Sequence, residues 1–128
     1  MTLLRLDHVN IRTSNLAAMI EWYVDVLGLT DGARPPFDFA GAWLYIGDAP
    51  IVHLVEVGNE PRSVEPKIEH FAISGTGLKA FVSKLKSRKV GYSLDEVPDF
   101  PIVQVNIRDC DGNHIHVDFP LAEAKGVH

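Results

Sequence analysis

The sequence lacks the features that mark several broad classes of protein. It has one cysteine, Cys110, so no internal disulfide can form. No apolar run approaches the roughly 18 residues that span a membrane, and Arg5 and Asp7 interrupt the apolar core that a signal peptide would need. Basic residues are few and unclustered, 12 against 17 acidic residues, for a net charge of −5. We therefore expect a cytoplasmic protein with no nucleic-acid or membrane partner.

What is present fits one compact globular domain over residues 1–128. Hydrophobic residues make up 46% of the chain and charged residues 23%, which is the balance of a folded soluble protein rather than a disordered one. Histidine is more frequent than this size requires, with six copies. Four of them lie inside apolar, strand-like runs.

The chain repeats itself. Residues 6–11 and 68–73 both read apolar, acidic, His, apolar, small or polar, apolar, and a second pair of His-containing runs comes later in each half. His70 follows His8 by 62 residues, and His116 follows His53 by 63 residues. These offsets predict a duplicated unit, with repeats at 3–58 and 66–120, a linker at 59–65 and a flexible tail at 121–128.

Each repeat is expected to contain a strand, a helix and three further strands, which makes an α+β fold of two βαβββ repeats. One such repeat buries too little alone, so we expect the two open sheet faces to surround a barrel-like cleft. Ser14 or Asn15 should begin the first helix and Gly28 should end it, while Gly91 should end the second. The expected strands are 3–12, 32–37, 42–46, 51–57, 67–74, 92–97, 102–108 and 114–119, and the second helix is 78–90.

The histidines at repeat-related positions predict a metal site. One strand histidine is more often a hydrogen-bonded core residue, but four at two equivalent positions favour metal ligation. His8, His53, His70 and His116 are the predicted ligands. Neutral imidazole suits zinc, nickel, cobalt, copper and iron(II). His114 leads its strand beside a turn, so we expect it to line the rim.

The motifs at the two ends of the chain resemble those of the vicinal oxygen chelate superfamily, which includes glyoxalases, bleomycin resistance proteins and extradiol dioxygenases. The opening residues Leu6 to Ile11, followed by Trp22-Tyr23 and Leu27-Gly28-Leu29, resemble the family's start. Residues 108–116, Arg-Asp-Cys-Asp-Gly-Asn-His-Ile-His, resemble its Asp-Pro-Asp-Gly-Asn-x-Ile-Glu ending. The resemblance covers residues 3–120 and implies a divalent cofactor (Zn, Ni, Co, Mn or Fe(II)) at the four histidines.

The sequence departs from this family at two ligand positions. Many relatives have Glu at the position of His116, and glyoxalases can have Glu at that of His53. Imidazoles at both leave the ion's charge near +2, which makes it a stronger Lewis acid, and they remove the carboxylate that glyoxalases use as base. A subset of His8, His70 and His116 would instead resemble an iron(II) dioxygenase site without its carboxylate.

Side chains on the cleft face should contact the substrate. Gln104 and Asn106 are amides in an otherwise apolar strand and need polar partners. Arg12 and Arg34 could meet an acidic group or make surface salt bridges, Trp43 and Tyr45 could equally pack in the core, and residues 34–41 could form a lid or a rigid loop. The predicted substrate-binding set is Asn10, Trp43, Tyr45, Gln104 and Asn106, and no catalytic residue is assigned.

These observations predict a metal-dependent enzyme of the glyoxalase type, an isomerase or lyase that moves a proton beside a carbonyl of a small substrate with adjacent oxygens. An iron(II) dioxygenase and a metal-free, antibiotic-binding resistance protein are the alternatives. The resemblance also implies a homodimer.

Overall fold

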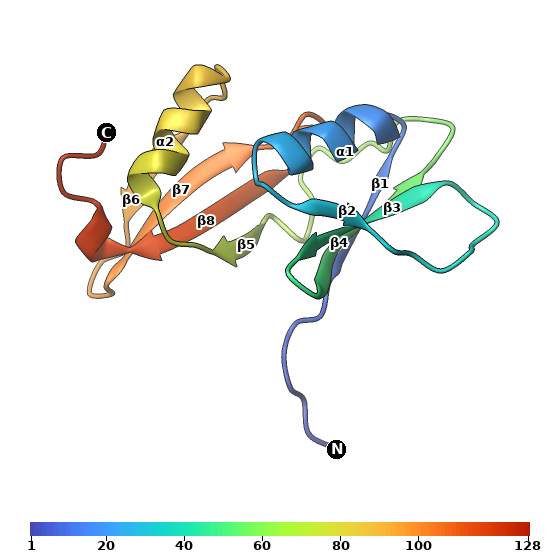
Figure 1. Ribbon diagram of the computed structural model, residues 1–128, viewed down its shortest axis with the longest axis horizontal. Helices are drawn as coiled ribbons and strands as arrows, with labels where there is room; N and C mark the ends of the chain where they lie inside the picture. The colour runs from blue at the N-terminus through green and yellow to red at the C-terminus, as the bar shows by residue number, and fades with distance from the viewer. The chain divides into compact units, whose positions relative to one another are not determined.

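The computed structural model describes residues 1–128, and the chain divides into two compact units, Met1–Ser63 and Val64–His128 (Figure 1). In each unit a strand, a helix and three further strands follow one another along the chain, and the four strands form one sheet. The α+β fold of two βαβββ units is therefore confirmed. Neither α-helix has the length and apolar character needed to cross a membrane.

The first unit forms a mixed sheet in the order β1-β4-β3-β2, where β1 runs parallel to β4 and the other pairs are antiparallel. Its core joins Met19 and Tyr23 of the helix to Leu44, Val52 and Leu54 of the sheet, each at most 1% exposed. Alternation along the strands then places Trp43 and His53 on the opposite face. The elements are β1 (Val9–Thr13), α1 (Leu16–Asp25), β2 (Thr30–Gly32), β3 (Gly41–Ile46) and β4 (Ala49–Glu56).

The second unit repeats this arrangement with the order β5-β8-β7-β6. Leu78, Val82 and Leu85 of its helix are buried, and the Phe81 ring lies 5.6 Å from that of Phe119. The register places Ala72 beside His116, as Asn10 lies beside His53 in the first unit. The elements are β5 (Phe71–Ser74), α2 (Leu78–Ser87), β6 (Ser93–Glu96), β7 (Ile102–Arg108), β8 (His114–Pro120) and a short 3-10 helix, η1 (Leu121–Glu123).

Several predicted boundaries are wrong for identifiable reasons. The first strand of each unit begins at Val9 or Phe71, because residues 3–8 and 67–70 have no hydrogen-bonded neighbour strand. The strand predicted at 32–37 lies at Thr30–Gly32 instead, and residues 33–37 form a loop, since the two prolines carry no N–H for a ladder. The second helix ends at Ser87, and Lys89, with φ of 56°, takes the left-handed position expected of Gly91. Gly28, with φ of 72°, follows the first helix as predicted.

Candidate metal centre

In the first unit three rings stack on the sheet face opposite the helix. His53 lies on β4, and its ring centroid is 3.7 Å from that of His8 and 4.0 Å from that of Trp43, with interplanar angles of 12° and 10°. Trp43 is the cross-strand partner of His53, and His8 immediately precedes β1 on the other side of β4. His53 is 7% exposed, so this stack keeps its imidazole away from water.

Hydrogen bonds fix which nitrogen of each imidazole carries a proton. Nδ1–H of His8 donates to Oδ1 of Asp7 at 2.8 Å, and this bond is the main cause that lowers the pKa of Asp7. Nε2–H of His53 donates to the carbonyl oxygen of Pro50 at 3.0 Å. In the neutral rings, Nε2 of His8 and Nδ1 of His53 then hold lone pairs. Burial, followed by repulsion from His8, lowers the pKa of His53 and keeps it neutral.

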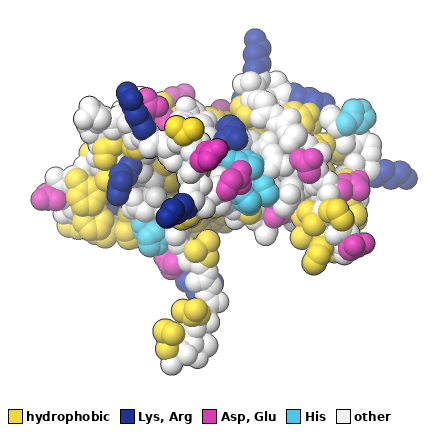
Figure 2. Space-filling model, turned by 180° about the vertical axis from the view of Figure 1, so that it is seen from behind, with side chains coloured by type: hydrophobic (Ala, Val, Ile, Leu, Met, Phe, Trp, Pro, Cys, Tyr) yellow, Lys and Arg dark blue, Asp and Glu magenta, His cyan; other side chains and the backbone are white.

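The second unit holds three histidines on the equivalent face, and Figure 2 shows histidine side chains gathered beside acidic ones on the surface. The rings of His70 and His116 stack at 3.9 Å and 16°. One nitrogen each of His70, His114 and His116 lies within 4.8 Å of the others. This cluster could hold a metal ion.

Glu69 connects two of these histidines. One carboxylate oxygen accepts from Nδ1–H of His70, and the other accepts from Nδ1–H of His114 at 2.7 Å. These two hydrogen bonds are the main causes that lower the pKa of Glu69. A carboxylate that holds Nδ1–H orients the ring and makes Nε2 a better metal ligand. His70 therefore offers Nε2, as His8 does in the first unit.

His114 is held from both sides. Its second nitrogen, Nε2, lies 2.9 Å from Oδ1 of Asn106, whose amide nitrogen donates to Asp95 at 2.8 Å. Both ring nitrogens of His114 are therefore already engaged with oxygen atoms of the protein, so His114 fits the cluster by distance but less well by hydrogen bonding. Sequence reasoning placed His114 at the rim and missed its contact with Glu69, which lies 45 residues away.

His116 is 8% exposed, and burial, followed by repulsion from His70, lowers its pKa. Its Nδ1 lies 3.8 Å from Oδ1 of Asp118, a buried oxygen that accepts no hydrogen bond. A buried acceptor without a partner is costly, and a small movement would let it accept from Nδ1–H of His116. The donor set, imidazoles with carboxylates behind them, fits a divalent ion that prefers nitrogen ligands.

The structure places the predicted substrate residues as follows. Trp43 joins the histidine stack, and Asn106 borders a cavity of about 470 Å³ that is also lined by Tyr92, Arg108 and His114. Tyr45 instead donates its hydroxyl hydrogen to the carbonyl oxygen of Ala33. Asn10 is exposed on β1, and Gln104 is half-buried across the ladder from Asp118.

Comparisons with known proteins agree on the family. A sequence model of the glyoxalase/bleomycin resistance protein/dioxygenase superfamily matches residues 5–117. No curated protein matches the chain.

Among solved structures, similar folds include a glyoxylase/bleomycin resistance protein/dioxygenase domain from Frankia sp. EAN1pec, with 17% identity, a TM-score of 0.77 and coverage of 99% of this chain and 96% of that one. A trypanothione-dependent glyoxalase I from Leishmania major has 19% identity and a TM-score of 0.70, over 94% of this chain and 90% of its own. A lactoylglutathione lyase from Agrobacterium tumefaciens has 15% identity and a TM-score of 0.63, over 88% and 90%.

Proposed function

Because the chain belongs to the glyoxalase/bleomycin resistance protein/dioxygenase superfamily, we propose that it is a divalent-metal-dependent enzyme of the glyoxalase type. Its substrate is a small molecule with two adjacent oxygens. The proposed ligands are His8 and His53 of the first unit and His70 and His116 of the second. Two solved structures with this fold are named as a glyoxalase I and a lactoylglutathione lyase, which supports the reaction class.

One observation carries this proposal: each unit builds the same pair of stacked imidazoles at equivalent positions. In both pairs, the histidine before the first strand donates Nδ1–H to the acidic residue that precedes it, Asp7 or Glu69. In both pairs the partner on the central strand is buried, and burial lowers its pKa. Two core histidines would not need to share these details, whereas metal ligands need both a fixed ring and a neutral nitrogen.

A bound divalent ion would supply Lewis-acid polarisation of a substrate carbonyl oxygen. The chain's own residues orient the ligands and bind the substrate. Asp7 and Glu69 orient His8 and His70, and burial keeps His53 and His116 unprotonated. Asn106 and Arg108 present polar groups at the edge of the neighbouring cavity, where substrate oxygens can be hydrogen-bonded.

Elemental analysis of protein purified without a histidine tag or chelator tests the proposal. Alanine substitutions of His8, His53, His70 and His116 should each weaken metal binding by more than the roughly 10–100-fold typical of residues that only support a ligand. His128→Ala is the matched control, because this histidine lies at the C-terminus and should not bind the ion.

The same preparation separates the alternatives. Zinc, nickel, cobalt or manganese together with isomerase or lyase turnover supports the proposal. Iron with oxygen consumption would support a dioxygenase instead. Absence of metal with tight ligand binding would support a sequestering protein and contradict the proposal. The metal-to-chain ratio gives the number of ions bound per chain.

A further inference from the structure

We propose that the first unit carries a stacking platform for a planar aromatic ring of the substrate, built from Phe37, Phe39 and Trp43. The inference rests on the proposed function, because the platform ends at the candidate ligand His53. It names the substrate class as an aromatic compound whose ring is attached to the carbon group that carries the two adjacent oxygens.

The platform is a continuous series of ring contacts. The rings of Phe37 and Phe39 stack with centroids 4.9 Å apart and an interplanar angle of 13°. Phe37 lies 6.5 Å from Trp43 at a 50° tilt, and Trp43 in turn stacks on His53 at 4.0 Å. These separations are close to those that aromatic pairs prefer. The series therefore runs from the loop between β2 and β3 to the imidazole proposed to bind metal.

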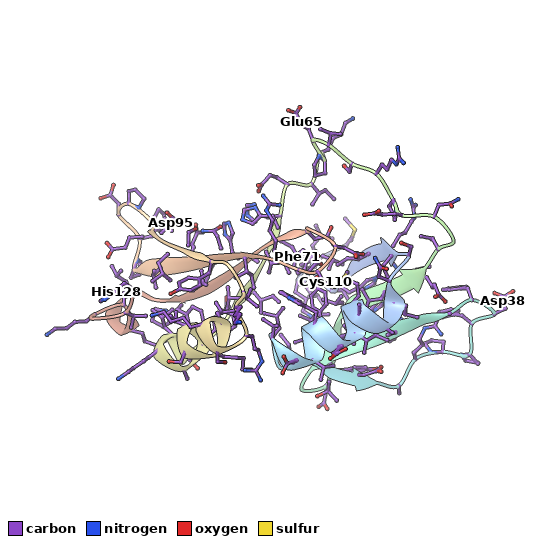
Figure 3. All side chains as sticks on the ribbon, turned by 90° about the horizontal axis from the view of Figure 1, so that it is seen from above. Asp38, Glu65, Phe71, Asp95, Cys110 and His128 are labelled. Carbon is purple, nitrogen blue, oxygen red and sulfur yellow. The ribbon has the colours of Figure 1, made fainter.

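The loop that carries the two phenylalanines is held in place. The Arg34 guanidinium lies 5.1 Å and 5.2 Å from the centroids of Phe37 and Phe39, and it donates to the carbonyl oxygen of Phe39 at 2.8 Å. Gly41 makes room for this contact, because a Cβ there would lie 2.2 Å from the carbonyl oxygen of Leu54 and 3.0 Å from the Arg34 side chain. Figure 3 labels Asp38 at the outer end of this loop. These contacts favour a rigid loop over a lid.

The exposed faces of these rings are available to a ligand. Phe37 is 45% exposed and Phe39 is 43% exposed. One exposed phenylalanine is ordinary, and Phe100 of the second unit, at 61%, is such a residue. The stacked pair of Phe37 and Phe39 differs from such a single residue, because it is held by Arg34 and joined to a candidate metal ligand through Trp43. Exposing this larger apolar surface to water is costly unless a ligand covers it.

The repeat shows that the fold does not require an aromatic side chain at the position of Trp43. Asn106 occupies the position in the second unit that corresponds to Trp43, at the same 63-residue offset as His53 and His116. Asn106 hydrogen-bonds to Asp95 and His114 instead of stacking. Two units with one architecture therefore differ in the side chain beside the buried histidine, which is aromatic in the first unit and polar in the second.

Two probes isolate the ring: phenylglyoxylate and pyruvate carry the same 2-oxo carboxylate and differ in a phenyl or a methyl group. Their dissociation constants should be measured by calorimetry with the metal-loaded protein and with metal-free protein. We expect the wild type to bind phenylglyoxylate at least about tenfold more tightly than pyruvate. In a Trp22→Phe background Trp43 is the single tryptophan, so its fluorescence should change with phenylglyoxylate and not with pyruvate.

Substitutions separate stacking from general apolar contact. Phe37→Leu and Trp43→Leu should reduce the preference to about threefold or less, while Trp43→Phe retains most of it. Phe100→Leu is the matched control and should leave the preference unchanged. Melting curves confirm that each variant is folded, and the leucine variants avoid the larger cavity of alanine.

The outcomes distinguish this inference from the proposed function. Equal binding of the two probes, binding of neither probe, or a preference that survives Trp43→Leu and Phe37→Leu overturns the platform. If the protein binds no divalent metal but still prefers the phenyl probe, the platform is supported, and the failure to bind metal contradicts the proposed function. If the protein binds metal but shows no ring preference, the proposed function is supported and the platform is contradicted.

Discussion

Replacing Asp109 should destabilise the second unit, because this carboxylate builds the turn that leads into β8. Asp109 is 5% exposed. Its Oδ1 accepts from the backbone N–H groups of Asp111 and Asn113, both at 2.9 Å, and its Oδ2 accepts from the Asn113 side chain at 2.8 Å. The turn ends one residue before His114, so the carboxylate also sets where the histidines of β8 begin (Figure 3 labels the neighbouring Cys110).

The expected magnitude follows from these three bonds. A hydrogen bond to a charged group contributes about 1.5–3 kcal/mol, and a buried donor left without a partner costs about 1–3 kcal/mol. Asp111 and Asn113 are half-buried, so water recovers part of the loss after Asp109→Ala. We expect the free energy of unfolding to fall by about 2–4 kcal/mol.

Urea unfolding followed by circular dichroism measures this loss. Asp48→Ala is the control, since Asp48 is an exposed residue of the turn that precedes β4, and it should change stability by less than about 0.5 kcal/mol. A loss below about 1 kcal/mol for Asp109→Ala, or an equal loss for Asp48→Ala, would refute the reasoning.

Three further predictions follow from other parts of the chain. Oε1 of Glu123 caps the start of α2, since it accepts from the N–H groups of Gly77 and Leu78 at 2.8 and 3.4 Å. Glu123→Ala should therefore lower the free energy of unfolding, measured by thermal unfolding, by about 1 kcal/mol, and a loss no larger than that of the control Glu60→Ala would contradict this role. Partial burial, then the carboxylates of Asp109 and Asp111, raise the pKa of Cys110. At pH 8, iodoacetamide should therefore react more slowly with Cys110 than with the thiol of free glutathione, and its reaction with Cys110 should speed up as the pH rises. Equal rates for the two thiols at pH 8 would count against a raised pKa. Leu3, Leu4 and Leu6 are 78–85% exposed on the N-terminal arm, and we expect a second copy of the chain to cover them. Light scattering should therefore find a dimer for the wild type and a monomer for the variant in which all three leucines are serine, and a monomeric wild type would disprove this expectation.

Much of the fold was predictable because the two halves of the sequence share the same pattern of residues. The offsets of 62 and 63 between histidines aligned two βαβββ units, and the alternation in Ile102–Arg108 predicted that strand with its correct bounds. The errors fall where neighbours decide the outcome. Residues 3–8 have a strand-like pattern but no partner strand, and the loop with Pro35 and Pro36 lacks the N–H groups of a ladder.

The candidate site was predictable only in part. The choice of the four histidines came from the repeat, whereas their stacking within each unit and the carboxylates behind them depend on side-chain geometry. Glu69 reaches His114 across 45 residues, and Asn106 meets the same ring from β7. Nor does strand alternation show that Arg34 lies against Phe37 and Phe39, because that contact forms within an irregular loop.

X-ray absorption spectroscopy of the metal-loaded protein tests the central claim most directly, because imidazole ligands give a characteristic outer-shell scattering. The account predicts a metal bound by several imidazoles. His8→Ala and His70→Ala should each remove imidazole scattering or the metal itself, while His114→Ala should leave the first coordination shell unchanged. A spectrum without imidazole, or one that neither His8→Ala nor His70→Ala alters, would contradict the claim that the repeated histidine pairs bind a divalent ion.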